Sequence, residues 1–411
     1  MKWVSTTIGQ HCTVTSSKRF HLSERSNSGI PFYCSKEIIQ KVNGEEVTEC
    51  DYIKDEAYER IKKSFGVPQA GDLLLTTRGT YGIPYIYQDR DKFYFADGNL
   101  TWLKNFDDSL LSPFLYYWIR SHEGQKKIDA IAKGTAQKAV PISLIKDISL
   151  SIPPIQYQQK VVDTLSAYDI LIQNNQKQIK LLEEVAQRLY KEWFVDLRFP
   201  GHETTPIVDG VPEGWTEKRF YELFSFVRGK SYTSKELSDA DGILMVNLKS
   251  IRPFGGFRRN QEKHYIGKYN ADQILEPGDI VMGVTDMTKE RRLVGHVALV
   301  PDLQEKATFS MDLIKITPFS LPKSYLYSVL HFGGLSAQIS QLANGVNVLH
   351  LKPEAMKNKS MLCPTEKIIS DYDKLFETIQ YRIEVLQKEC DLAVETRDRL
   401  LPKLMSREIE V

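Results

Sequence analysis

The chain has 411 residues, of which 42% are hydrophobic and 26% are charged, and a typical domain size of ~150 residues gives two to three domains. This much apolar material excludes a mostly disordered chain. No apolar stretch reaches the ~18 residues that span a bilayer, and the opening MKWVSTTIGQHC lacks the apolar core of a secretory signal. The cysteines are scattered without a CxxC pair, so neither a disulfide framework nor a zinc ribbon is expected. We therefore expect a cytoplasmic protein with no membrane partner.

The overall charge does not indicate a polyanionic partner. Lys and Arg number 54 against 53 Asp and Glu, which gives a formal net charge of +1. Residues 219–260 are locally basic, but an ordinary solvated surface explains that excess more simply than a binding patch does.

Landmarks in the first half of the chain recur in the second half in the same order. Trp3 corresponds to Trp215 at an offset of 212 residues, and GDLLLTT from Gly71 corresponds to GDIVMGV from Gly278 at an offset of 207. The segment KGTAQKAVPISLIKDISLSIPP (133–154) aligns with NGVNVLHLKPEAMKNKSMLCP (344–364) at an offset of 211. Because these landmarks share nearly one offset, the sequence predicts two copies of one unit of ~205 residues.

Each copy begins with short β-rich runs that Gly, Pro and Asp turns separate, and continues with helical runs. Strands are expected at 72–77, 84–88 and 92–96, and again at 243–248, 279–284 and 296–301. Helical runs are expected at 112–132 and 322–343. The pattern predicts a mixed α/β or α+β globular domain that is present twice.

A long helix is predicted to end each copy. Apolar side chains recur at heptad-like spacing in both segments: Ile172, Ile179, Leu182, Ala186, Leu189 and Trp193 in the first, and Ile379, Leu386, Ala393 and Leu400 in the second, from Glu366 to about Leu401. This spacing forms one seam, which favours an antiparallel coiled coil of the two helices over two separate amphipathic helices. A helix of ~36 residues is a rod of roughly 50 Å. The predicted domains are therefore 1–154, 155–200, 201–364 and 365–411.

Known catalytic and cofactor motifs are absent from the sequence. It contains no Walker motif, no GxGxxG, no [DNS]PP[FYW] loop of an amino-methyltransferase, no HExxH and no GxSxG. Its eight histidines show no metal-ligand spacing. We interpret the chain as a non-catalytic recognition or scaffold module with no metal or cofactor of its own.

The segment PPIQYQQKVVDTLSAYDILIQNNQKQIKLLEEVAQRLYKEWFV resembles the central conserved region of the specificity (S) subunits of type I restriction–modification enzymes. VPEGW before the second copy is similar to the usual opening of a target recognition domain in that family, and 133–154 is similar to its closing segment. The second long helix differs more from the family pattern, because the segment that leads into it, CPTEK, is shorter than the corresponding SIPPIQYQQ of the first. The matching positions of the central region are Pro153, Pro154, Gln158, Gln159, Val161, Asp169, Ile172, Asn175, Leu189, Trp193 and Phe194.

The resemblance implies two target recognition domains that each read one half of an asymmetric split sequence in double-stranded DNA. Two methyltransferase (M) subunits would dock on the paired helices, and restriction/translocase (R) subunits would join them. S-adenosylmethionine, ATP and Mg would then be bound by these partner subunits. The internal repeat further suggests a pseudo-twofold arrangement.

Loops that correspond between the two copies supply the candidate DNA-reading side chains. Arg and Lys read guanine, and Asn and Gln read adenine, through bidentate hydrogen bonds in the major groove. In the first copy the candidates are Thr76, Thr77, Arg78, Tyr81, Lys133, Thr135, Gln137 and Lys138. In the second copy they are Arg258, Arg259, Asp286, Lys289, Arg291, Arg292, Asn344, Asn347 and His350.

Two alternatives remain open from the sequence. The chain could serve a methyltransferase without restriction, or it could be a tandem-repeat coiled-coil scaffold that binds proteins and no nucleic acid. Polar, Gly-rich loops at matched positions before each long helix favour DNA recognition, because a scaffold would not need them. An enzyme with an unrecognised site is the weakest interpretation.

Overall fold

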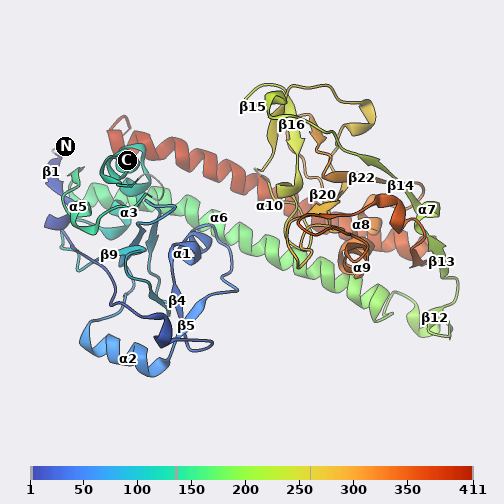
Figure 1. The fold of residues 1–411 in the computed structure, drawn as a ribbon, viewed down its shortest axis with the longest axis horizontal. Coiled ribbons are helices and arrows are strands. Elements are labelled where there is room, and N and C mark those ends of the chain that lie inside the picture. The colour runs from blue at the N-terminus through green and yellow to red at the C-terminus, as the bar shows by residue number, and fades with distance from the viewer. Residues whose placement is uncertain (1–2, 135–137, 260, 410–411) are drawn as a thin grey trace. The chain divides into compact units, whose positions relative to one another are not determined.

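A computed structural model describes residues 3–134, 138–259 and 261–409, and it divides into two units (Figure 1). The first unit combines Met1–Gln176 with Glu389–Val411, and the second is Lys177–Lys388. Each long helix therefore contributes one part to each unit. No helix in the described ranges is long and apolar enough to cross a membrane.

The first unit contains two small four-stranded sheets and one strand pair. The sheets have the orders β2-β9-β6-β7 and β3-β5-β4-β8, and β1 pairs with β10. The strands are β1 (Val4–Thr7), β2 (Thr13–Thr15), β3 (Arg25–Ser26), β4 (Ile30–Tyr33), β5 (Asp51–Ile53), β6 (Leu73–Thr76), β7 (Pro84–Ile86), β8 (Tyr94–Phe95), β9 (Leu100–Lys104) and β10 (Ser149–Ile152). The helices are η1 (Ile8–Gln10), η2 (Leu22–Glu24), α1 (Ser35–Val42), α2 (Asp55–Ser64), α3 (Ser112–Arg120), α4 (His122–Ile131), α5 (Ile142–Ile145) and the start of α6 (Ile155–Tyr190).

The second unit repeats both four-stranded sheets and the strand pair, and it adds the pairs β11-β12 and β19-β23. Its sheets have the orders β14-β22-β18-β20 and β15-β17-β16-β21, and β13 pairs with β24. The strands are β11 (Ile207–Val208), β12 (Val211–Pro212), β13 (Thr216–Arg219), β14 (Phe224–Arg228), β15 (Leu237–Ser238), β16 (Ile243–Val246), β17 (Lys263–Tyr265), β18 (Ile280–Gly283), β19 (Thr285–Asp286), β20 (Val297–Leu299), β21 (Ala307–Phe309), β22 (Leu313–Pro318), β23 (Leu349–His350) and β24 (Ser360–Cys363). The helices are η3 (Lys191–Val195), η4 (His202–Thr204), α7 (Phe220–Leu223), η5 (Ser234–Glu236), η6 (Leu248–Ser250), η7 (Ala271–Gln273), α8 (Lys323–Phe332), α9 (Leu335–Ser340), η8 (Pro353–Met356) and the start of α10 (Glu366–Ser406). The predicted internal repeat and the mixed helix-and-strand fold are confirmed.

The central strands of both units are apolar because both of their faces are covered. All four residues of β6 and all four of β18 are buried. In the first unit, Leu73 and Leu75 share a core with Phe114 of α3 and Leu165 of α6. In the second, Ile280 and Met282 share one with α8, α6 and α10. The long helices thus complete the core of each unit.

Each predicted helical run between the sheet and the long helix is broken into two helices. In 112–132 the break falls at Ser121, whose Oγ accepts a hydrogen bond from the Gly124 amide at 3.2 Å and so caps α4. In 322–343 it falls at Gly334, which has a left-handed φ of 74° that glycine adopts readily. Periodicity continues through both breaks, so it could not locate them.

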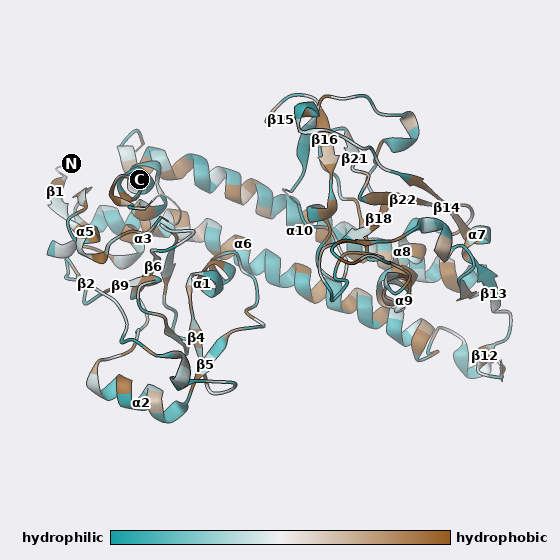
Figure 2. Cartoon of the chain, viewed as in Figure 1, coloured by the Kyte–Doolittle hydropathy of each residue, from teal (hydrophilic) through white to brown (hydrophobic). Residues whose placement is uncertain are grey.

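The two long helices pair antiparallel along the predicted apolar seam. In the first unit, Tyr157 Oη donates to the carbonyl oxygen of Ile409, and Asn175 Nδ2 donates to Glu389 Oε2 at 2.8 Å. Residues later in α6 therefore contact residues earlier in the C-terminal segment, which makes the pairing antiparallel. In the second unit, the rings of Tyr190 and Trp193 lie 6.3 and 5.9 Å from the ring of Tyr372. Both helices show alternating polar and apolar residues along their lengths (Figure 2).

The predicted seam residues divide into two groups by burial. Six are buried: Ile172, Ile179, Ala186, Trp193, Leu386 and Ala393. Four are half-buried: Leu182, Leu189, Ile379 and Leu400. Leu189 and Ile379 nevertheless pack against the core of the second unit, and Leu400 packs against that of the first.

The second long helix continues beyond the predicted end near Leu401. It passes through Pro402 and ends at Ser406, although proline removes one backbone hydrogen bond. Leu401, Leu404 and Met405 are buried in the core of the first unit. Their burial offsets the missing hydrogen bond, a tertiary effect that the local sequence does not show.

Candidate nucleic-acid interface

In the first unit, two segments far apart in the sequence form one surface. The loop after β6 contacts the segment after α4: the amide of Val140 donates to the carbonyl of Thr77 at 2.8 Å, and Arg78 forms a β-bridge with Ala139. Lys133 and Ala139 exchange two backbone hydrogen bonds of 2.8 Å, which close a hairpin. Its Gly134 has φ 107°, a left-handed conformation that suits glycine.

The second unit builds the same surface from the corresponding residues. The amide of Leu351 donates to the carbonyl of Val284 at 2.8 Å, and β19 pairs with β23. Asn344 and His350 close the hairpin with hydrogen bonds of 3.0 and 2.8 Å. A side chain on Gly345 would place its Cβ 1.9 Å from the carbonyl oxygen of Val348, so this position requires glycine. The two loop pairs that the sequence aligned are thus joined in each unit.

Exposure separates the first-unit candidates into two groups. Arg78, Lys133 and Lys138 are exposed. Thr76 and Thr77 are 0% and 2% exposed, and Thr76 Oγ1 accepts a hydrogen bond from the amide of Ile83. We therefore withdraw both threonines as DNA contacts, because Thr76 ends the buried strand β6 and Thr77, which follows it, is buried as well.

The remaining first-unit candidates are Tyr81, Thr135 and Gln137. Tyr81 is half-buried, and its hydroxyl donates to Asp129 Oδ1 at 3.0 Å, so it links the loop to α4. Thr135 and Gln137 lie outside the described residues, and they stay predictions.

In the second unit, Arg291 and Asp286 shape the loop rather than face solvent. Arg291 Nη1 donates to the carbonyl oxygens of Ser340 and Ala343, the latter at 3.0 Å. Asp286 is fully buried, and its carboxylate accepts hydrogen bonds from Thr288 and from the amides of Leu293 and Val294. Both are therefore corrected from reading residues to positioning residues, because Nη1 of Arg291 and both carboxylate oxygens of Asp286 are engaged within the protein.

The electrostatics of Asp286 follow from this arrangement. Burial opposes ionisation of its carboxyl group, but the hydrogen bonds from Leu293, Thr288 and Val294 outweigh burial. The pKa of Asp286 consequently lies below its usual value. An ionised Asp286 holds the turn that presents Lys289 and Arg292.

The other candidates on these second-unit loops are accessible. Lys289, Asn344, Asn347 and His350 are exposed, and Arg292 is half-exposed beside Glu290 at 3.8 Å. The sequence analysis missed the apolar side chains at the same loop tips: Met287 is 81% exposed and Val346 is 100% exposed. Their only signal was an apolar residue within a polar loop, which is common on protein surfaces.

The two arginines that follow the Gly255–Gly256 pair have different environments. Arg258 is exposed, whereas Arg259 Nη1 donates to the carbonyl of Asp302 and its Nη2 lies 3.6 Å from Glu384 Oε1 of α10. Arg259 is therefore a structural contact to the long helix. The same segment reaches the candidate surface through Phe254, whose amide donates to the carbonyl of Arg292 at 2.7 Å.

The described residues contain no group of three or more His, Cys, Asp or Glu side chains that could hold a metal ion. The two loop surfaces present cationic and amide side chains on loops that backbone hydrogen bonds join. Such side chains contact phosphates and base edges in duplex DNA.

Comparisons with known proteins agree with this chemistry. Residues 1–184 match the family described as the type I restriction modification DNA specificity domain. The chain is 25% identical over 353 residues to the type I restriction enzyme MjaIX specificity subunit of Methanocaldococcus jannaschii, covering 83% of this chain and 78% of that one. It is 27% identical over 427 residues to the HindI specificity subunit of Haemophilus influenzae, and the alignment covers 89% of this chain and 90% of that one.

The fold is similar to a solved relative over nearly the whole chain. The crystal structure of the type I restriction–modification S subunit from M. genitalium covers 98% of this chain and 96% of its own, with a TM-score of 0.58 and 15% identity. The repeat, its loops and these relatives make the chain similar, over most of its length, to the DNA specificity subunits of restriction–modification systems. The resemblance recognised in the sequence is confirmed: residues 1–184 match the type I DNA specificity domain family, and most of the chain aligns with type I specificity subunits.

Proposed function

We propose that this chain is the non-catalytic recognition subunit of a type I restriction–modification enzyme, and that each repeat reads one half of a bipartite DNA target. The observation that carries the proposal is the pair of matched loop surfaces, closed by Val140–Thr77 in one repeat and Leu351–Val284 in the other. The two loop surfaces have the same backbone arrangement but different exposed side chains. They therefore suit two different half-sites, so the target is asymmetric.

The side chains on the two surfaces suit different bases. The first repeat presents Arg78, Lys133 and Lys138, whose donors match guanine acceptors and phosphates. The second presents Asn344 and Asn347 beside Lys289, and asparagine amides match adenine. A nearly neutral chain supplies little sequence-independent attraction to DNA, so partner subunits add phosphate contacts.

The long helices carry the partners in this proposal. Two methyltransferase subunits dock on α6 and α10 and bind S-adenosylmethionine, and the restriction subunits that join them bind ATP and Mg. Exposed apolar side chains along the helices support a protein partner there, among them Ile170 and Leu171 on α6 and Tyr381 and Leu392 on α10.

Methylome sequencing of the source cell with and without the gene tests the proposal. We expect deletion to erase one split, asymmetric methylation motif, and reintroduction of the gene to restore it. A methylome that is identical in both strains would contradict the proposal. Incubation of the purified chain with S-adenosylmethionine and DNA adds a second test, because methyl transfer by the chain alone would contradict its non-catalytic role.

A further inference from the structure

The two repeats differ in a connection of the sheet that contains β3, β4, β5 and β8 in the first repeat. Between β4 and β5 the first repeat folds the helix α1, whereas the described residues between the equivalent strands β16 and β17 form only the short turn η6. Two readers with one topology can select different sequences only where their side chains or segments differ. This connection is therefore where a difference in specificity is expected.

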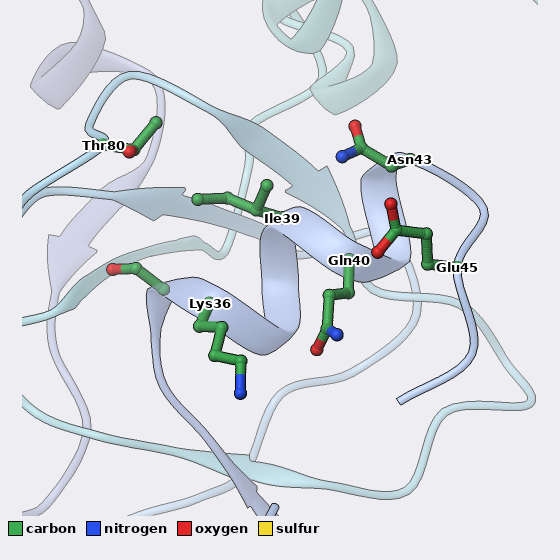
Figure 3. Close-up of a pocket in the computed structure, with 7 residues that line it drawn as sticks. Lys36, Ile39, Gln40, Asn43, Glu45 and Thr80 are labelled. Atoms are coloured by element: carbon green, nitrogen blue, oxygen red, sulfur yellow. The ribbon is translucent and has the colours of Figure 1, made fainter. Parts of the chain in front are cut away.

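The connection adjoins the candidate DNA surface in both repeats. In the second repeat, Phe254 of this connection donates its amide hydrogen to Arg292 of the reading loop. In the first, residues of α1 and of the following turn line an open cleft of about 400 Å³ together with Thr80, two residues after Arg78 (Figure 3). The cleft thus adjoins the surface that Arg78 forms with Lys133 and Ala139.

The cleft has the chemistry of a site that reads bases. Lys36, Gln40 and Asn43 follow each other at helical spacings of four and three, so they lie along one face of α1. Lys36 and Glu45 balance in charge, which does not suit a phosphate site, where cations predominate. Gln40 lines the cleft and is half-buried, and its Oε1 lies below the surface without a hydrogen-bond partner among the described residues, so a turn of this side chain into the cleft would let a donor from a ligand complete its bonding.

We propose that α1 is an additional reading element of the first repeat, and that Gln40 and Asn43 determine specificity within one half-site. This inference rests on the proposed function. The exposed face of α1 enters the major groove, which is wide enough to admit a helix, and its amides pair with base edges, adenine fitting them best. Ile39, half-buried in the same cleft, is placed to contact a thymine methyl group.

Replacement of the chromosomal gene by variants, followed by methylome sequencing, tests this inference in the complete enzyme. For the double variant Gln40→Ala, Asn43→Ala we expect a loss of discrimination of about tenfold or more at one or two positions of one half-site. The other half-site stays unchanged and reports that the protein is folded. The matched control is Gln88→Ala, an exposed amide of the same unit outside the cleft, for which we expect the parental motif.

The outcomes separate this inference from the proposed function. If deletion of the gene erases a motif that the double variant methylates at parental occupancy, the role of α1 is wrong while the proposed function stands. If deletion leaves the methylome unchanged, the proposed function itself fails. Loss of all methylation with a lowered melting temperature of the purified double variant would show a structural role for the two amides and overturn the inference. Gln40→Glu provides a second variant. A shift of the preferred base toward cytosine at one position of the motif would support the inference, since glutamate accepts a hydrogen bond from cytosine N4.

Discussion

Arg397 of α10 donates a hydrogen bond of 2.6 Å from Nη1 to Asp169 Oδ1 of α6, across 228 residues of chain. The other carboxylate oxygen of Asp169 accepts a hydrogen bond from the Tyr117 hydroxyl of α3 at 2.6 Å, and Arg120 of the same helix lies 3.7 Å away. One carboxylate therefore joins both long helices to the globular part of the first unit. Asp169 is also one of the positions that matched the family's central region.

Removal of the Arg397 guanidinium should destabilise the first unit. Arg397 is 12% exposed and Asp169 18%, so Arg397→Met leaves a largely buried carboxylate with Arg120, at 3.7 Å, as its remaining cation. We expect the free energy of unfolding to fall by about 1.5–3 kcal/mol in urea titrations. The matched control is Arg399→Met, because Arg399 of the same helix is 77% exposed and pairs with Glu395, a pair worth at most ~1 kcal/mol. Equal effects of the two variants would contradict the role of the Asp169 network.

The buried carboxylate of Asp286 should make stability depend on pH in the acid range. Its folded pKa lies below the usual value of 3.8, so its contribution is present above that pH and is lost as the pH falls through the folded pKa. Asp286→Asn turns an amide group toward the N–H donors of Leu293 and Val294 and should cost about 1–3 kcal/mol at pH 7. The difference between wild type and variant should narrow as the pH falls below 3.8.

Denaturant unfolding between pH 2.5 and 7 measures this difference. Asp241→Asn, at an exposed position of the same unit, provides the control and should leave the pH profile unchanged. A stability difference between wild type and Asp286→Asn that stays constant over the whole range would argue against the ionised turn.

Variants in the two loop surfaces should affect different half-sites. Arg78→Ala removes an exposed guanidinium from the first repeat, and Asn347→Ala removes an exposed amide from the second. We expect each to relax one half of the methylated motif, with a cost of about 1–3 kcal/mol where the side chain reads a base. Motif sequencing of both strains checks this. Changes that fall in the same half-site for both variants would contradict one reader per repeat.

The paired helices should set the spacing of the half-sites. Insertion of seven residues after Gln176 in α6 and after Lys388 in α10 preserves the apolar seam and adds about 10 Å of helix. Because DNA rises ~3.4 Å per base pair, we expect the spacer between the half-sites to lengthen by about three base pairs. The same insertion in α6 alone shifts the register of Tyr190 against Tyr372, beyond the insertion, and should lower stability instead. An unchanged spacer in the double insertion would show that the helices do not determine the distance.

The repeat, the order of its elements, the seam of the long helices and the family resemblance could be predicted from the sequence. These features are local or periodic: buried strands such as β6 are continuous apolar runs, and a seam needs only an apolar residue every seven positions. The aligned offsets also matched the loops of one copy to those of the other, and the structure shows that the two loops of each copy meet. The approximate start of each long helix followed from the same alignment.

Only the tertiary structure decided what each loop residue does. Thr77 and Arg78 are neighbours in the sequence, yet one is buried and the other exposed, because the loop that follows β6 reaches the surface between them. Arg291 and Arg292 are both half-buried, but only Arg291 donates to carbonyl oxygens of a segment some fifty residues later among the described contacts. Helix α10 likewise continues past Pro402 only because the core of the first unit buries Leu404. Each of these outcomes depends on atoms brought from distant parts of the chain, and no pattern of neighbouring residues encodes their positions.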